Sequence, residues 1–199
     1  MRIVAGAYRG RSLVAPKGHS TRPTADRVRQ ALFNIQEHAA WSPGLKAMRV
    51  IDLFAGSGSL GIEALSRGAA MCRFLDQDAA AAAAIEANLA ALSLGDRASV
   101  ERRDIARLGE RPASLNAGFD IAYLDPPYGQ GLAEIALAAL ERGDWLAPGA
   151  VAIVERGAGE APLVAPGFET LDSRVWGAAK VWFLRLDFPS VGGRPLCVT

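Results

Sequence analysis

The residues best suited to chemistry are Asp125-Pro126-Pro127-Tyr128, which come directly after a mostly apolar run at 119–124. That run is typical of a strand buried on both faces of a parallel sheet. Two prolines end the strand and stiffen the loop, because each lacks a backbone donor and has a fixed φ. The Asp125 carboxylate and the Pro126 carbonyl could accept the two N–H bonds of an exocyclic amine, while the ring carrying that amine stacks on Tyr128. An ordinary strand-to-loop turn would also use Asp and Pro.

A glycine-rich segment supplies a second motif between a short apolar strand at 49–51 and a predicted helix at 60–67. Gly56, Gly58 and Gly61 form a G-x-G-x-x-G, in which glycine permits tight turns and close approach of a ligand to the backbone. Asp76 lies 20 positions after Gly56, at the end of the next apolar run. A carboxylate at that spacing can accept both hydroxyls of a ribose. The combination predicts an adenosine-type cofactor.

Two cofactor classes fit these features, the nicotinamide dinucleotides and S-adenosylmethionine. A dinucleotide would place its pyrophosphate at the N-terminus of the helix. Asp52, at the end of the strand before the glycines, would repel a pyrophosphate but could attract the ammonium of a methionine moiety. The Asp125 loop (residues 125–128) adds a site for an amine acceptor, which a hydride-transfer enzyme would not need. The two motifs together favour a methyltransferase with Asp125, Pro126 and Tyr128 as its catalytic residues.

With these motifs the chain resembles a known family, the class I methyltransferases of the small-subunit (16S) ribosomal RNA guanine-N2 type, or RsmD type. The resemblance runs from Arg2 to about Asp187. Besides the two loops, it rests on five N-terminal motifs: Arg2-Ile3-Val4-Ala5-Gly6, Arg9-Gly10-Arg11, Arg22-Pro23-Thr24, Asp26-Arg27-Val28-Arg29 and Ala31-Leu32-Phe33-Asn34. Relatives commonly carry Glu where this chain has Asp76, so only the reach of the ribose contact differs.

The resemblance implies an activity and a set of site residues. The substrate would be the N2 amine of a guanine in small-subunit ribosomal RNA, either free or within an assembled ribosomal particle. Asp104 would accept the adenine amine of S-adenosylmethionine, and Ile105 would pack on the adenine ring, although Asp104 is equally suited to cap a helix. The full expected cofactor set is Asp52, Phe54, Gly56, Gly58, Gly61, Asp76, Asp104 and Ile105.

Positive charge is concentrated at the N-terminus although the whole chain carries only +1. Residues 1–29 hold seven basic side chains against one acid, a local charge of +6. Scattered charges usually form a solvated face. Clustered beside a nucleotide-type site, these charges favour contact with RNA phosphates, and the residues expected to make it are Arg9, Arg11, Arg22 and Arg27.

Strands alternating with helices predict a doubly wound, mostly parallel, Rossmann-like α/β sheet of seven strands. Its final hairpin, at 168–176 and 180–186, is expected to be antiparallel. Residues 1–40 are expected to form a small RNA-contacting extension with a β-hairpin and a helix from Thr24 to about Ala39, residues 41–189 the methyltransferase domain, and residues 190–199 a loose tail. A fifth strand is expected at 151–155. Its last residue, Glu155, could either face the target pocket or form a solvated strand end.

Composition excludes several other classes of protein. No apolar run approaches the roughly 18 residues of a membrane span, and no charged leader with an apolar core opens the chain. Cys72, Cys197 and the two histidines show no metal-ligand spacing, so we expect no metal and a reducing cytoplasm. Two alternatives to the favoured function stay open: an N6-adenine or N4-cytosine methyltransferase on RNA or DNA, and a binding module without catalysis.

Overall fold

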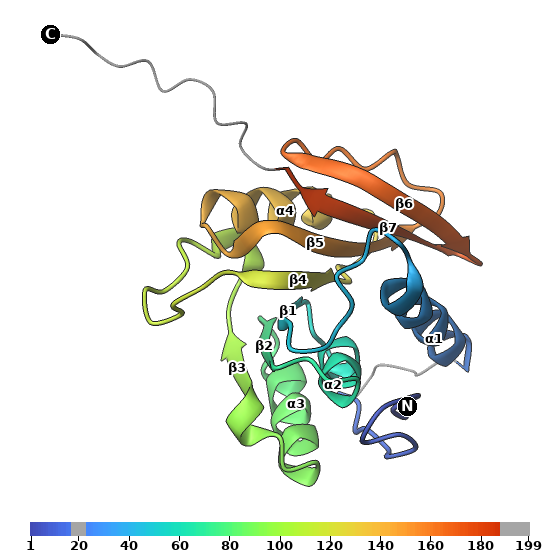
Figure 1. Ribbon diagram of the computed structural model, residues 1–199, viewed down its shortest axis with the longest axis vertical. Coiled ribbons are helices and arrows are strands. Elements are labelled where there is room, and N and C mark those ends of the chain that lie inside the picture. The colour runs from blue at the N-terminus through green and yellow to red at the C-terminus, as the bar shows by residue number, and fades with distance from the viewer. Residues whose placement is uncertain (17–22, 188–199) are drawn as a thin grey trace, which may run out of the picture.

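A seven-stranded sheet with helices on both faces forms the body of the protein in the computed structural model, which describes residues 1–16 and 23–187. The strand order is β3-β2-β1-β4-β5-β7-β6 (Figure 1). Neighbouring strands from β3 to β5 are parallel, whereas β7 is antiparallel to both β5 and β6. The doubly wound sheet with an antiparallel final pair is therefore confirmed.

Most elements lie within one or two residues of their predicted positions. The helices are α1 (Pro23–His38), α2 (Ser59–Ser66), α3 (Ala79–Ala91) and α4 (Leu132–Arg142), with short 3-10 turns at Gly95–Arg97 and Ile105–Arg107. The strands are β1 (Arg49–Leu53), β2 (Met71–Asp76), β3 (Ala98–Arg102), β4 (Phe119–Leu124), β5 (Leu146–Gly157), β6 (Phe168–Trp176) and β7 (Ala179–Leu186).

The predicted start of one strand is wrong, and the N-terminal hairpin is shorter than a regular two-stranded ribbon. Strand β5 begins at Leu146, five residues before the predicted start. Pro148 and Gly149 favour a turn in the sequence, but here they lie inside the strand, where its pairing with β4 is irregular.

The expected N-terminal hairpin is present but short. Its two arms form one antiparallel bridge, between Arg2 and Ser12, and the N–H groups of Ile3, Gly10 and Leu13 donate backbone hydrogen bonds across it at 2.9–3.0 Å. The chain turns between the arms through Gly6 and Gly10 at positive φ. The predicted tail at 190–199 lies outside the described residues.

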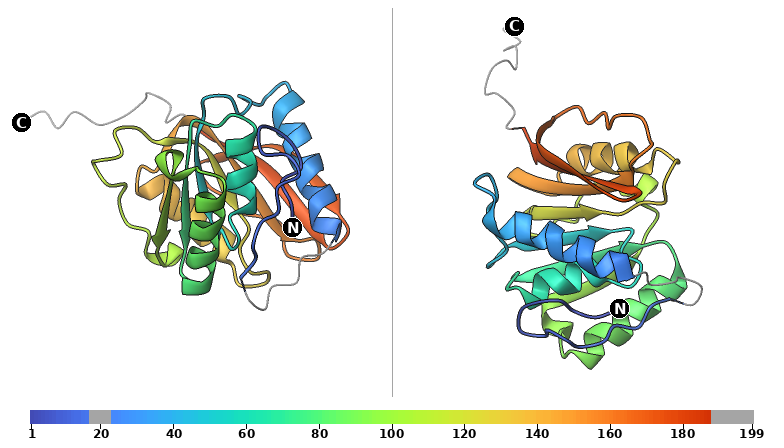
Figure 2. Two further views of the ribbon diagram at one scale, coloured as in Figure 1. Left: turned by 90° about the horizontal axis from the view of Figure 1, so that it is seen from below. Right: turned by 90° about the vertical axis from the view of Figure 1, so that its right-hand side faces the viewer.

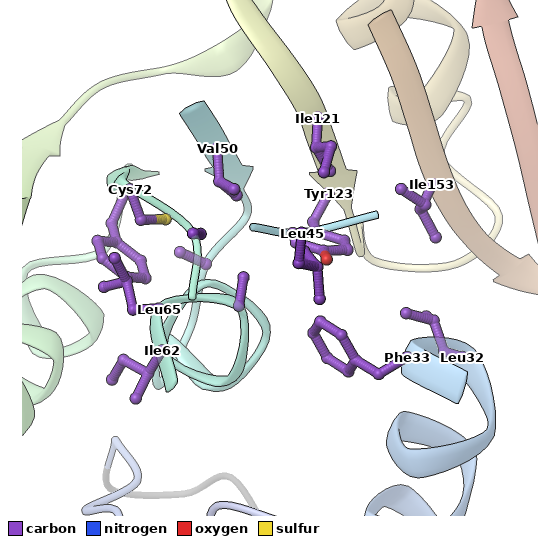
Figure 3. Packing of buried hydrophobic residues seen from close by; sticks show 14 of the residues in the cluster. Leu32, Phe33, Leu45, Val50, Ile62, Leu65, Cys72, Ile121, Tyr123 and Ile153 are labelled. Atoms are coloured by element: carbon purple, nitrogen blue, oxygen red, sulfur yellow. The ribbon is translucent and has the colours of Figure 1, made fainter. Parts of the chain in front are cut away.

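The core has one layer on each face of the sheet. On one face, α1 and α2 pack against β1, β4 and β5 through residues such as Phe33, Ile62, Tyr123 and Ile153 (Figure 3). On the other face, α4 and the turn at Ile105–Arg107 cover Leu53, Leu124 and Val154. Strand β4 alternates between these layers, and all of its residues except Asp120 are buried, as its mostly apolar sequence predicts.

Helix α1 is fixed to the sheet by polar as well as apolar contacts. The Tyr123 hydroxyl in β4 donates a hydrogen bond to Gln36 Oε1 at 2.5 Å, and both side chains are fully buried. The helix starts at Pro23 rather than after Thr24, and proline suits a first helical position because its missing N–H would have no partner there. Figure 2 shows α1 and the first 16 residues lying on the same side of the sheet as α2.

The first residues of the chain are held on α2 by a buried carboxylate. Glu63 accepts the backbone N–H groups of Val4 and Ala5 at 2.8 and 2.9 Å, and its side chain is 0% exposed. Gly6 lies so close to α2 that a β-carbon there would be 2.0 Å from the Ser66 carbonyl oxygen. Ile3 and Leu13 join the same core layer as α1 and α2. The N-terminal extension is thus packed into the core of the sheet domain.

Among the described residues, no helix is long and apolar enough to cross a membrane.

Candidate active site

The two sequence motifs meet where the strand order of the sheet reverses. Chain connections leave β1 and β4 on opposite sides at this point, and in open α/β sheets ligands bind in the crevice at the carboxyl ends of strands connected in this way. The pairing of Leu53 with Leu124 brings the next residue of each strand, Phe54 and Asp125, to the same edge. Leu53 also pairs with Leu75 in β2, which places Asp76 on the other side of the glycine loop (residues 52–61).

Two aspartates shape the glycine loop through backbone hydrogen bonds. Asp52 Oδ2 accepts the Gly61 N–H at 2.8 Å, and Asp76 Oδ2 accepts the Gly56 N–H at 2.8 Å. Asp76 Oδ1 also accepts the Asp78 N–H at 2.9 Å. The sequence motif indicated ligand contacts for both carboxylates but did not indicate that they also hold the loop. Each carboxylate oxygen has two acceptor positions, so a ribose contact by Asp76 remains chemically open.

Burial dominates the electrostatics of Asp52. Its side chain is 1% exposed, and desolvation raises the pKa of its carboxyl well above the ordinary value. The Gly61 N–H lowers this pKa, but the negative charges of Asp125 and Asp76 raise it further. The site is therefore a cluster of mutually repelling carboxylates, which a positively charged ligand would stabilise.

The three glycines have different structural roles. A β-carbon at Gly61 would lie 2.3 Å from a ring carbon of Phe74 and 2.5 Å from Cys72 Sγ, so Gly61 allows α2 to pack on β2. Gly58 has φ +75° and is also enclosed by core side chains at 3.2–3.3 Å. Gly56 has φ +56°, and the nearest atom to its β-carbon would be Phe54 O at 3.9 Å. Of the three, Gly56 has the open surroundings that a ligand needs.

Phe54 departs from ordinary backbone geometry. Its φ is 58°, in the left-handed region that non-glycine residues rarely occupy. Its ring is partly buried and packs against the core layer that contains Leu53 and Leu75. Such strain is often found at ligand sites, where the surrounding structure holds it in place. Phe54 is therefore placed at the crevice, and its contact with a cofactor stays a prediction.

The structure assigns Asp104 a capping role. Asp104 Oδ1 accepts the Ala106 N–H at 3.0 Å and so caps the 3-10 turn at Ile105–Arg107. Ile105 is only 4% exposed and packs in the core layer with α4. Its side chain therefore offers little surface to an adenine ring. Binding of the cofactor by Asp104 or Ile105 stays a prediction, because the capping hydrogen bond and the core packing do not bear on it.

The Asp125 loop is braced from the neighbouring strand β5. Tyr128 is 46% exposed, and its hydroxyl donates a hydrogen bond to Glu155 Oε1 at 2.6 Å. Desolvation and the hydrogen bond to the Glu155 carboxylate raise the pKa of Tyr128, so the hydroxyl stays protonated. Pro126 is buried whereas Pro127 is exposed. The start of the loop is thus held in place by the buried Pro126, and the aromatic ring of Tyr128 is reached by solvent.

Asp125 has an altered acidity. Desolvation, followed by the charge of Glu155, raises the pKa of Asp125 from the ordinary value of 3.8 to about 7. The residue still reaches solvent in the free protein, and water screens part of this effect. A carboxylate with a raised pKa close to neutrality can accept a proton from a substrate.

A second set of charged residues lies beside the Asp125 loop, and the sequence did not indicate it. Arg156 is 7% exposed and forms ion pairs with Glu134 of α4 and Glu160, both at 3.0 Å. Glu160 Oε1 also accepts the Gly157 N–H at 2.8 Å. These three charged residues lie around Pro126 and Tyr128 at a shallow depression. The signal available in the sequence was an arginine at the end of a mostly apolar strand, Arg156 in β5.

The predicted RNA-contacting arginines divide into separate groups. Arg9, Arg11 and Arg27 are exposed, whereas Arg22 lies outside the described residues. Arg11 Nη2 also donates to the Ala91 carbonyl at 3.1 Å. Arg29, counted in the local charge of +6, is 5% exposed and lies 3.9 Å from Glu63, so it is unsuited to contact RNA. A groove of about 300 Å³ lies between the first residues and α1, lined by Arg2, Val4, Arg27, Gln30, Ala31 and Asn34.

The chain is similar to known proteins over most of its length. The family model described as "Conserved hypothetical protein 95" matches residues 1–185. Ribosomal RNA small subunit methyltransferase D from Escherichia coli (strain K12) is 38% identical over 156 residues, covering 78% of this chain and 74% of the relative. The Haemophilus influenzae protein of the same name is 38% identical over 173 residues, covering 86% of each chain.

The likeness extends to three dimensions. The solved structure of yhhF from Escherichia coli superposes with a TM-score of 0.79 and 34% identity, covering 94% of this chain and 98% of that one. The family model and this structural match both span nearly the whole chain. The chain belongs to the family of ribosomal RNA small subunit methyltransferase D.

Proposed function

We propose that this protein transfers a methyl group from S-adenosylmethionine to the exocyclic N2 amine of a guanine in small-subunit ribosomal RNA. The observation that carries this proposal is the Asp125 loop, braced by Glu155 at the end of β4, beside the glycine loop at the end of β1. The names of the relatives support ribosomal RNA of the small subunit as the substrate class.

The residues present fit S-adenosylmethionine as the cofactor. Asp52, Asp76 and Asp125 repel one another, and a ligand with a sulfonium and an ammonium group would relieve that repulsion, whereas a pyrophosphate would add to it. The open surroundings of Gly56 leave the backbone accessible to a ligand. We assign the cofactor to Asp52, Phe54, Gly56 and Asp76, with Asp104 and Ile105 at the adenine end. Gly58 and Gly61 act indirectly by allowing the loop to pack.

The chemistry demands alignment more than strong acid–base catalysis. Bound S-adenosylmethionine supplies a methyl group that is already activated by the adjacent sulfonium. The guanine N2 amine is a weak nucleophile because its lone pair is delocalised into the ring. Asp125 and the Pro126 carbonyl would accept its two N–H bonds and favour the form whose lone pair is available, and Tyr128 would stack on the base. Correct alignment of reacting groups can contribute about 7–11 kcal/mol to lowering a barrier.

A proton must leave N2 once the new C–N bond has formed. The methylated amine is cationic and loses its proton easily, so the acceptor need not be a strong base. Asp125, with its raised pKa, can take that proton and pass it to solvent. The target base must leave its stack to reach the loop, which favours an unpaired or weakly paired nucleotide as the target.

The exposed arginines are assigned to the RNA backbone. Arg9, Arg11 and Arg27 come from the first residues and from α1, so phosphate contacts there would hold the RNA while the base enters the crevice. Arg22 is included by sequence alone. In this proposal the N-terminal extension binds the RNA backbone in the cytoplasm, and the substrate is either free RNA or RNA within an assembled ribosomal particle.

The proposal is tested by transfer of labelled methyl groups to small-subunit particles and to naked RNA, followed by digestion to nucleosides. N2-methylguanosine is the expected product, and N6-methyladenosine or N4-methylcytosine would contradict the guanine assignment. Asp125→Ala should lower turnover by orders of magnitude and leave S-adenosylmethionine affinity, measured by calorimetry, nearly unchanged. Wild-type turnover in that variant would refute the role of the loop, and tight NAD binding without S-adenosylmethionine binding would refute the cofactor.

A further inference from the structure

The carboxylate of Glu155 lies beside that of Asp125 because of strand register. Strands β4 and β5 are parallel neighbours in which Tyr123 pairs with Ile153 and Leu124 with Val154. The next pair in this register is Asp125 and Glu155. Side chains alternate between faces, so both carboxylates follow Tyr123 and Ile153 onto the face that carries α1 and α2.

This pairing of like charges has no evident benefit for stability. The charge of Glu155 raises the pKa of Asp125, which means that the two carboxylates repel each other in the free protein. The nearest arginine in sequence, Arg156, points to the other face and pairs with Glu134 and Glu160. Glu155 itself accepts the hydroxyl of Tyr128. Two acceptor groups thus stand side by side next to the ring on which the base would stack.

We propose that Glu155 is the residue that selects guanine, by accepting the N1–H of the target base while Asp125 and the Pro126 carbonyl accept the N2 amine. This inference rests on the proposed function, because it assumes that the amine enters the Asp125 loop. On the edge of guanine, N1–H and the N2 amine are adjacent donors, and they match the adjacent acceptors of Glu155 and Asp125. A carboxylate has room for about four hydrogen bonds, so Glu155 can accept N1–H as well as the Tyr128 hydroxyl.

The same arrangement rejects the other amine-bearing bases. Adenine presents the lone pair of N1 beside its amine, and cytosine presents the lone pair of N3. Either would face the Glu155 carboxylate acceptor to acceptor and leave it without a hydrogen bond. A site built to bond one polar group discriminates strongly against analogues that lack it.

A simpler role for Glu155 would be to hold Tyr128 in place. Tyr128→Phe removes the same hydrogen bond and leaves the Glu155 carboxylate in place, so this variant isolates the bracing role. Glu155→Gln keeps an oxygen that can accept the hydroxyl and supplies an N–H₂ group that can donate to a ring nitrogen. The preference for guanine should therefore differ between the two variants only if Glu155 contacts the base.

The decisive probe is 2,6-diaminopurine, which keeps the N2 amine of guanine but has a lone pair at N1. Wild-type protein is first used to map the modified position in small-subunit particles. Particles are then reconstituted with RNA carrying guanine or 2,6-diaminopurine at that position, and methyl transfer is compared by kcat/KM. We expect wild-type protein to prefer guanine by about 100-fold or more. Glu155→Gln should narrow this preference by at least tenfold, and Tyr128→Phe should leave it unchanged while lowering both rates.

A pH profile gives a second readout. Glu155→Gln removes the charge that repels Asp125, so the loss of turnover on acidification should move to lower pH. Tyr128→Phe keeps that charge and should not produce this movement. Glu169→Gln, on the exposed start of β6, serves as the control for loss of a glutamate elsewhere.

The outcomes separate this inference from the proposed function. If wild-type protein methylates 2,6-diaminopurine as well as guanine, Glu155 does not read N1–H, whether or not the variant folds. If Glu155→Gln keeps the full preference for guanine, the inference also fails. In both cases a wild-type product of N2-methylguanosine would leave the proposed function standing, whereas a product on adenine or cytosine would overturn the proposed function itself.

Discussion

Replacing Glu63 should detach the N-terminal extension from the sheet domain. Its two carboxylate oxygens accept Val4 N–H at 2.8 Å, Ala5 N–H at 2.9 Å and Arg67 Nε at 2.8 Å, and Arg29 Nε lies 3.9 Å away. In Glu63→Gln, an amide N–H₂ must replace one of those oxygens. Whichever way the amide is oriented, at least one backbone donor then faces another donor in a fully buried site.

The magnitude follows from these contacts. A hydrogen bond to a charged group contributes about 1.5–3 kcal/mol, and removing one partner of a buried ion pair costs about 3–5 kcal/mol. We therefore expect Glu63→Gln to lower the free energy of unfolding by about 3 kcal/mol. With a slope of about 2 kcal/mol per molar urea, the unfolding midpoint should fall by about 1.5 M. Hydrogen exchange of the amides at positions 4–8 should accelerate.

Glu37→Gln is the matched control. Glu37 bonds the same arginine, with Arg67 Nη1 at 2.9 Å, but its side chain is 31% exposed. A partly exposed ion pair of this kind contributes about 0–1 kcal/mol. Equal midpoints for the two variants would refute the view that Glu63 anchors the extension. Loss of stability without faster exchange at positions 4–8 would place the effect elsewhere.

Three further predictions concern acidity, the glycine loop and RNA. Turnover should fall as pH drops below about 7, because Asp125 then binds a proton and can no longer accept the amine. The folded pKa of Asp125 lies above the ordinary 3.8, so its favourable contribution to stability is present below about pH 3.8 and is lost as the pH rises to about 7. Asp125→Asn should therefore melt at a higher temperature than wild type at pH 8 but not at pH 3. A flat activity profile from pH 5 to 8 would contradict this. Gly61→Ala should destabilise the fold by about 1–3 kcal/mol or more because of its contact with Phe74, whereas Gly56→Ala should cost only about 1–2 kcal/mol and should weaken S-adenosylmethionine binding, measured by calorimetry. Unchanged affinity in Gly56→Ala would remove Gly56 from the site. Changing both Arg9 and Arg11 to Ala should weaken RNA binding and flatten its dependence on salt by about one to two units on a log–log plot, with Arg142→Ala at the end of α4 as the control. An unaltered slope would mean that these arginines form a solvated face.

Local sequence predicted most of the elements because local rules govern them. The mostly apolar run at 119–124 and the glycines after β1 each identified an element correctly. The start of β5 was wrong because Pro148 and Gly149 favour a turn locally, while pairing with β4 and β7 extends the strand through an irregular region. The N-terminal hairpin is present, but the sequence did not reveal that Gly6 also lies close to the Ser66 carbonyl of α2.

The sequence by itself determined the family, the order of strands and helices, and the two loops that carry the candidate chemistry, because each depends on residue types at short spacing. Tertiary structure decided which of these residues serve packing and which are available to a ligand. Only packing shows that Gly61 serves the contact of α2 with β2 while Gly56 stays open, and that Arg29 belongs to a buried ion pair. Only the register of β4 with β5 brings Asp125 and Glu155 together. These residues are 30 positions apart, and no local pattern fixes which strands become neighbours, because that depends on how the whole sheet buries its two faces.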